Sequence, residues 1–250
     1  MNLAFGLVAF APALTLGSFL NVVATRLPRG ASVVRGRSVC PHCQTTIQAR
    51  DNVPLLSYVL LRGRCRHCSR PIALRYPAVE LATAALVALS IARFGLTGRG
   101  LVAAFFTAVL VVLSAIDIEH RILPNAIVLP ATVVVLGAQI ALAPARAPEW
   151  VLAALGASLF LFLALLAYPA GMGMGDVKLA LLLGAALGKT VAVGLMIGML
   201  AALVAALVLF VRHGAAARKM AIPFGPFLAL GSIVALFAGE ALLSAYLGLF

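Results

Sequence analysis

Acidic side chains are scarce in this chain of 250 residues, in which seven aspartates and glutamates stand against 19 lysines and arginines. Charged residues of either sign make up only 10% of the sequence, whereas hydrophobic residues make up 64% and the mean hydropathy is +1.13. A soluble domain of this size cannot bury so much apolar surface, so a soluble fold is excluded. The composition predicts an all-α polytopic membrane protein.

Polar interruptions are few enough to divide the chain into apolar segments. We expect about eight transmembrane helices, at about 3–24, 77–94, 99–117, 125–143, 149–169, 176–188, 190–211 and 222–249. Because roughly 20 residues span the hydrocarbon core, the segment 176–188 is too short for a full span. Either the glycine-rich stretch before it enters the membrane as irregular backbone, or this helix crosses only part of the bilayer.

The basic residues are unevenly distributed between the two sides of such a bundle. If both ends of the chain face away from the cytoplasm, 15 basic residues lie on the cytoplasmic side and 4 on the other. The positive-inside rule favours this orientation for a protein surrounded by lipid. It also explains the net charge of +12 without a nucleic-acid partner. The cytoplasmic pieces are then 25–76, 118–124, 170–178 and 212–221.

Cysteine occurs only four times, and all four lie in the one long polar stretch. Residues 40–47 and 65–72 repeat the pattern C-x-H-C-x-x-x-I, so that Cys40, Cys43, Cys65 and Cys68 form two C-x-x-C pairs. This spacing is typical of a closed four-cysteine Zn²⁺ site, with iron as the alternative, and argues against disulfides. The sulfurs fill the coordination sphere, so His42 and His67 are not expected to be ligands.

A metal in this stretch has a structural purpose, because fifty residues are too few to form a stable core without one. The sequence therefore predicts three parts: a first transmembrane helix at 1–24, a cytoplasmic Cys₄ domain at 25–76, and a membrane core of about seven helices at 77–250.

Two of the few acidic residues, Asp117 and Asp176, lie at the predicted cytoplasmic edge of the bilayer. A carboxylate at the bilayer centre costs about 2.5–3.5 kcal/mol on insertion scales, so a function is expected for it. Two facing carboxylates share a proton, and the ionised one can activate a water while the other polarises a carbonyl, as in aspartic proteases. Alternatively, each aspartate caps or solvates a helix end, or the pair forms a proton or cation pathway.

The neighbours of Asp176 in "GMGMGDVK" (171–178) fit a catalytic site. Gly173 and Gly175 can let the backbone approach a substrate strand and adopt unusual dihedral angles. Lys178 can bind a substrate carboxylate or favour the ionised aspartate, or it can serve as a simple interfacial anchor.

Taken together, these motifs resemble the bacterial type IV prepilin peptidase family over almost the whole chain. The matching stretches are "GSFLNVVATRLP", the two cysteine pairs, "RYPAVE", "DIEHRILPN", "GMGDVKL" and "PFGPFLALG". The resemblance implies cleavage of the short basic leader of prepilins or pseudopilins on the cytoplasmic face of the bacterial inner membrane, with Asp117 and Asp176 as the catalytic aspartates. The long cysteine-bearing loop resembles that of bifunctional members, which also methylate the new N-terminus with S-adenosylmethionine. Glu80 is a candidate for the methyltransferase site, or a lone interfacial charge.

Two other classes of protein compete with this interpretation. A zinc-stapled transporter or ion channel with paired carboxylates in its path would show mid-membrane carboxylates and half-repeats, neither of which is visible. A membrane scaffold that uses the zinc domain to bind partners leaves the "GMGD" stretch without a purpose.

Overall fold

The computed structural model of the protein describes residues 3–169, 171–214 and 222–248, so Arg218 and Lys219 of the basic segment 212–221 lie outside the described residues. Helices dominate the described part, where pairing between extended segments is limited to isolated β-bridges. Seven helical stretches there are long and apolar enough to cross a membrane. These findings confirm the prediction of an all-helical polytopic membrane protein. The chain forms two compact units, residues 1–116 and 117–250.

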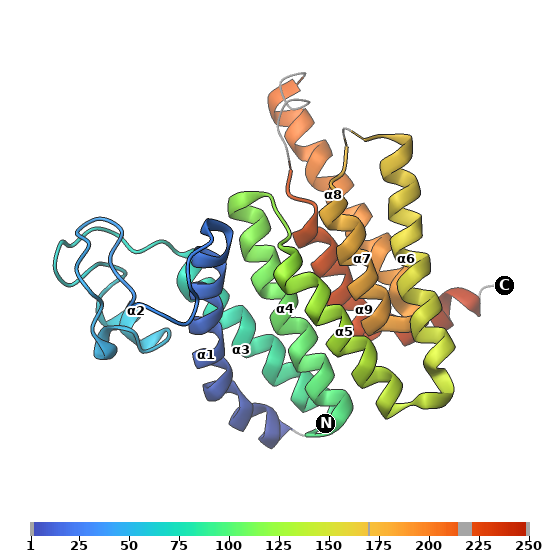
Figure 1. Ribbon diagram of the computed structural model, residues 1–250, viewed down its shortest axis with the longest axis horizontal. Helices are drawn as coiled ribbons and strands as arrows, with labels where there is room; N and C mark the ends of the chain where they lie inside the picture. The colour runs from blue at the N-terminus through green and yellow to red at the C-terminus, as the bar shows by residue number, and fades with distance from the viewer. Residues whose placement is uncertain (1–2, 170, 215–221, 249–250) are drawn as a thin grey trace. The chain divides into compact units, whose positions relative to one another are not determined.

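In the first unit, α1 (Leu3–Arg26) packs along α3 (Arg75–Phe94), as Figure 1 shows. The two helices approach closely at Gly17, where an added Cβ would come 2.7 Å from Cα of Glu80. The amide of Asn21 donates a hydrogen bond of 3.0 Å to the carbonyl oxygen of Tyr76. Small residues and buried polar contacts of this kind are the usual means by which membrane helices associate, and here they set the register of the pair.

The polar residues 25–76, called the loop domain below, connect α1 with α3. Their regular structure is limited to one short helix, α2 (Leu56–Leu60), and two 3₁₀ turns, Leu27–Arg29 and Ala49–Asp51. The guanidinium of Arg26 organises the first part of the domain by donating hydrogen bonds of 2.8–3.1 Å to four carbonyl oxygens, those of Ser32, Arg35, Gly36 and Arg37. A domain with so little regular structure depends on such side-chain bonds and on its cysteines.

Helix α4 (Gly98–His120) begins in the first unit, and its last turn belongs to the second. The division into compact units thus falls inside a helix rather than at the ends of the loop domain. The predicted boundaries at 24/25 and 76/77 coincide within two residues with the ends of α1 and α3, and the three-part division itself stays a prediction.

The second unit contains five further helices, which are α5 (Asn125–Leu142), α6 (Ala147–Ala167), α7 (Met174–Leu187), α8 (Val191–His213) and α9 (Gly225–Leu247). Figure 1 shows α7 among the other helices of this unit, and it packs against α5, α6 and α9. Its side chains form the centre of the unit, since Leu179, Leu182 and Leu183 are at most 1% exposed.

Helix α7 is short, as expected for the segment 176–188. Its 14 residues span about 21 Å, against a hydrocarbon thickness of about 30 Å. Gly173 precedes it in an extended conformation, and a 3₁₀ turn (Gly188–Thr190) joins it directly to α8, which makes Met174–His213 one helical stretch of 40 residues. A short helix with an aspartate in its first turn places that carboxylate near one end of the buried centre.

Candidate active site and metal centre

Asp117 lies in the last turn of α4 and is only 5% exposed. One of its carboxylate oxygens, Oδ2, accepts a hydrogen bond of 3.0 Å from the backbone N–H of Gly225. Gly225 is the first residue of α9, and the first N–H groups of a helix lack intrahelical acceptors and carry a partial positive charge. The carboxylate of Asp117 is therefore held at the N-terminus of a helix that begins more than a hundred residues later.

Asp176 occupies the third position of α7 and is 9% exposed. Its Oδ2 accepts a hydrogen bond of 3.3 Å from the backbone N–H of Gly173. Gly173, and not Asp176, occupies the N-cap position, but through this bond Asp176 caps the start of α7 from the third helical position. The alternative that it caps a helix end is therefore confirmed, and only its assignment to the N-cap position is wrong. Each of the two aspartates thus has one carboxylate oxygen fixed by a backbone N–H at the start of a helix.

The segment after α4 brings the surroundings of the two aspartates together. Leu123 lies against both glycines that flank the site: a Cβ on Gly175 would be 3.1 Å from Cβ of Leu123, and one on Gly225 would be 3.4 Å from its Cδ2. The ends of α4, α7 and α9 therefore converge on the two buried carboxyl groups.

The two glycines of the motif have other tasks than the unusual backbone angles expected of them. Gly173 is extended, with φ −95° and ψ 155°, and Gly175 is not among the glycines with positive φ. Gly173 supplies the N–H that holds Asp176, and Gly175 gives Leu123 the room to pack against α7. The expectation of unusual dihedral angles is wrong, and the close approach of a substrate strand stays a prediction.

Lys178 has a partner that the sequence did not suggest. Its Nζ donates a hydrogen bond of 3.0 Å to Oδ1 of Asn125, the first residue of α5. An amide oxygen satisfies one of the three ammonium donors but leaves the positive charge uncompensated. This arrangement ties α5 to α7 beside the site and leaves the charge of Lys178 available to an anion.

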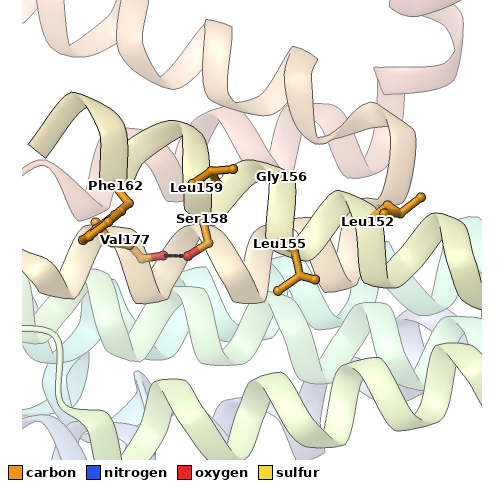
Figure 2. Close-up of a pocket in the computed structure, with 7 residues that line it drawn as sticks. All are labelled: Leu152, Leu155, Gly156, Ser158, Leu159, Phe162 and Val177. Atoms are coloured by element: carbon orange, nitrogen blue, oxygen red, sulfur yellow. Dashed lines mark hydrogen bonds between the residues drawn. The ribbon is translucent and has the colours of Figure 1, made fainter. Parts of the chain in front are cut away.

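An open groove of about 590 Å³ runs along α6 beside the start of α7 (Figure 2). Its lining contains no ionisable side chain and consists of Leu152, Leu155, Gly156, Ser158, Leu159, Phe162 and Val177. The hydroxyl of Ser158 is already used, because it donates a hydrogen bond of 3.1 Å to the carbonyl oxygen of Val177. The groove therefore offers apolar surface rather than reactive groups.

The four cysteines converge in the loop domain as their spacing predicts. Their sulfurs all lie within 4.8 Å of one another, with 3.8 Å between those of Cys40 and Cys68 and 4.0 Å between those of Cys43 and Cys65. Tetrahedral Zn²⁺ with Zn–S bonds of about 2.3 Å requires sulfurs roughly 3.8 Å apart. The cluster therefore fits a single ion of this size, and His42 and His67 lie outside it.

The sequence repeat is also a structural repeat. In each copy the first cysteine donates its N–H to a carbonyl five residues later, Thr45 or Arg70, and an isolated β-bridge closes the turn. The residue four places after that cysteine, Gln44 or Ser69, has a positive φ of 58° or 56°. Two copies of one tight turn thus present two sulfurs each to a common centre.

Hydrogen bonds in these turns favour thiolates, which are the form that binds metal. The hydroxyl and then the backbone N–H of Thr45 lower the pKa of Cys43 to about 6. The backbone N–H groups of Cys68 and then His67 lower the pKa of Cys65. At Cys68 the N–H of Arg70 acts in the same direction, but burial and the neighbouring sulfurs raise its pKa to about 11. Four adjacent thiolates repel one another, so a cation is needed to ionise the last of them.

Glu80 lies in the first unit, in the second turn of α3, and is 9% exposed. Its Oε2 accepts a hydrogen bond of 2.9 Å from the backbone N–H of Leu55, a residue with a positive φ of 57°. The interpretation of Glu80 as a lone interfacial charge is therefore wrong, because this carboxylate fastens the loop domain to α3. Its assignment to a methyltransferase site stays a prediction.

Two contributors to the site were missed from the sequence alone. Gly225 acts through its backbone N–H, and no pattern of side chains in the sequence predicts this role. Asn125 follows a proline and looks like an ordinary helix start. Their partners, Asp117 and Lys178, are 108 and 53 residues away in the chain.

Comparison with known proteins assigns both parts of the chain to the family that its sequence motifs resemble. Residues 12–94 match the model of the bacterial peptidase A24 N-terminal domain, and residues 104–211 match that of the type IV leader peptidase family. No solved structure matches the chain.

Several curated relatives carry the name prepilin leader peptidase/N-methyltransferase. One from Burkholderia pseudomallei (strain 1026b) is 38% identical over 96% of this chain and 86% of its own length. Another from Bacillus subtilis (strain 168) is 34% identical over 96% of this chain and 97% of its own. A third from Legionella pneumophila is 32% identical over 94% of this chain and 92% of its own length. With both family models matched in order and such relatives aligned nearly end to end, the chain belongs to the type IV prepilin leader peptidase family.

Proposed function

We propose that this protein is a bifunctional membrane enzyme that removes the leader of prepilins or pseudopilins and then methylates the new N-terminal residue. The name of its relatives supports both activities. The observation that supports the first most directly is the pair of buried carboxyl groups of Asp117 and Asp176, each held by a backbone N–H at the start of a helix. Family membership favours this function over a transporter, a channel or a scaffold.

Cleavage then follows the chemistry of an aspartic protease. One carboxylate is ionised and accepts a proton from a water molecule, whose oxygen attacks the carbonyl carbon of the scissile peptide bond. The other carboxyl group is protonated and donates a hydrogen bond to the carbonyl oxygen as negative charge develops there. The first carboxyl group then passes the proton that it took from the water to the amide nitrogen as the C–N bond breaks. The backbone N–H groups of Gly173 and Gly225 keep both carboxyl groups in place during this step.

The active site is proposed to face the cytoplasm of a bacterial inner membrane. Under this orientation Asp117 and Asp176 lie at one edge of the bilayer, where the polar leader of the substrate meets its hydrophobic helix. The distribution of 15 basic residues against 4 supports this choice.

The cofactors have different roles in this proposal. Cys40, Cys43, Cys65 and Cys68 hold a structural Zn²⁺, whose full set of four sulfur ligands leaves no open position for chemistry. S-adenosylmethionine supplies the methyl group, which follows from the relatives' name, with Glu80 as the candidate residue of that second site.

Mass spectrometry of a purified prepilin incubated with this protein tests both activities. We expect loss of the leader both with and without S-adenosylmethionine, and the additional mass of one methyl group only when S-adenosylmethionine is present. Asp117→Asn and Asp176→Asn should each abolish cleavage while the protein stays folded, and the double variant should lose nothing further, because the two groups act as a unit. Glu240→Gln, at an exposed position on α9 where the carboxylate pairs with Lys189, is the control and should cleave normally. Appreciable cleavage by either single variant would refute the catalytic pair.

A further inference from the structure

We propose that α2 and the arginines beside it bind the surface of a bilayer that contains anionic lipids, so that the loop domain is docked onto the same membrane that α3 crosses. The partner is a lipid surface, and the proposal depends on α3 being a membrane helix rather than on the proposed catalytic function. Three observations carry it: the depth at which α2 is held, the side chains that it exposes, and the charge of the domain.

The depth follows from the bond between Leu55 and Glu80. Leu55 immediately precedes α2, and its N–H is held 2.9 Å from Oε2 of Glu80. Glu80 is five residues into the candidate membrane span that starts at Arg75, which corresponds to about 7.5 Å along the helix axis. Interfacial helices bury their apolar faces about 5–10 Å into the boundary between headgroups and acyl chains. The start of α2 is therefore fastened at the depth where such elements lie.

The exposed side chains of α2 are apolar. Leu56, Val59 and Leu60 are 55%, 70% and 70% exposed. The buried polar residue of the helix, Ser57, is turned inward, where it accepts the N–H of Val53 and donates to the carbonyl oxygen of Arg50. Figure 1 shows α2 at the lower edge of the loop domain, on the side of that domain toward the N-terminal end of α1. A single turn with this hydroxyl inward and three large apolar groups outward suits a lipid interface better than water.

The charge of the loop domain selects the kind of lipid. The domain contains ten arginines and one acidic residue, Asp51, whose carboxylate is already bound to Arg66. Arg62 and Arg64 follow α2 closely and are exposed. Guanidinium groups bind phosphate oxygens in pairs, and basic segments beside a membrane helix are attracted to anionic headgroups. A basic substrate leader or a second copy of this domain would be repelled by the same charge.

Fluorescence of a single tryptophan tests the proposal on the full-length protein. Trp150, the only tryptophan in the chain, is first replaced by phenylalanine, and Val59→Trp is then added. The control, Val34→Trp, changes the same residue type in the same domain at a site that is 86% exposed. In nanodiscs with acyl-chain-brominated lipids, we expect the tryptophan at position 59 to lose most of its emission and the one at position 34 to keep most of its own. Leu60→Trp, at a position as exposed as Val59, repeats the measurement should the first variant fold poorly.

The lipid charge is tested in the same system. Quenching at position 59 should deepen as anionic phospholipid replaces zwitterionic lipid and should weaken with salt, and Arg62→Gln with Arg64→Gln should remove this dependence. Three results would overturn the proposal. The first is equal quenching at positions 34 and 59, and the second is quenching at position 59 that does not depend on the lipid charge. The third is protection of position 59 from both lipid and aqueous quenchers, which would mean that protein covers α2. The measurement involves no cleavage, so a failed proteolytic assay leaves its outcome unchanged.

Discussion

At the scale of single residues, the structure directs attention to Gly225. Its N–H donates to Asp117, and its missing side chain leaves the room that this carboxylate occupies. A Cβ at position 225 would come 2.8 Å from Oδ2 of Asp117 and 3.4 Å from its Cγ. Any residue larger than glycine must therefore displace the aspartate or the start of α9.

We predict that Gly225→Ala lowers kcat for leader cleavage about 100-fold and changes KM little, because misplacing a reacting group by about 1 Å has an effect of that order. The matched control is Gly239→Ala on the same helix, where the new Cβ meets Thr190 at 2.9 Å and touches no aspartate. Steady-state kinetics on a purified prepilin separates the two parameters. Equal losses in both variants would mean that α9 packing, and not the position of Asp117, limits the rate.

A second residue-scale prediction concerns Lys178, whose ammonium group donates a hydrogen bond to the neutral side-chain amide of Asn125. The family resemblance implies a glutamate shortly after the cleavage site of the substrate, and a charge in that apolar helix needs a partner. We expect Lys178→Met to slow cleavage of such a substrate much more than cleavage of one with glutamine there. Asn125→Ala removes the hydrogen bond but keeps the charge, so it should preserve the discrimination. Equal slowing of both substrates by Lys178→Met would leave only an anchoring role.

At the scale of elements, the loop domain depends on its metal more than on a core. We predict one Zn²⁺ per chain, measured by elemental analysis of protein purified under reducing conditions. Cys43→Ser should lose the metal, make residues 25–76 sensitive to proteases and lower activity indirectly, since metal binding supplies the folding free energy of such small domains. His42→Ala and His67→Ala are the controls and should retain the metal. Protein with neither zinc nor iron would contradict the four-cysteine site.

At the scale of the whole molecule, the distribution of basic residues predicts the orientation in the membrane. We expect a cysteine introduced at Val34 to react with a membrane-impermeant reagent only after the cells are opened, and cysteines at Leu96 or Ala145 to react from outside. All three sites are exposed and lie between the long helices, and the unmodified chain reports the background from its four clustered cysteines. The opposite labelling pattern would place the paired aspartates on the outer side and refute the proposed cytoplasmic site.

The sequence by itself determined the features that depend on composition and short-range spacing. A hydrophobic content of 64% requires a membrane, whatever the arrangement of the helices. The two C-x-x-C turns predict their own metal site, because each turn is formed by hydrogen bonds within five residues of its first cysteine. The shortness of α7 was also visible, since the glycines before Asp176 and the next apolar segment set its limits.

Only the tertiary structure decided which groups meet across long stretches of chain. The bond between Asp117 and Gly225 and that between Glu80 and Leu55 each join a carboxylate to a backbone N–H. Every residue except proline carries such a donor, so the sequence contains no signal that selects one of them. The selection comes from packing: Leu123 fits against glycines on two helices, and that fit sets where the end of α4 meets the starts of α7 and α9.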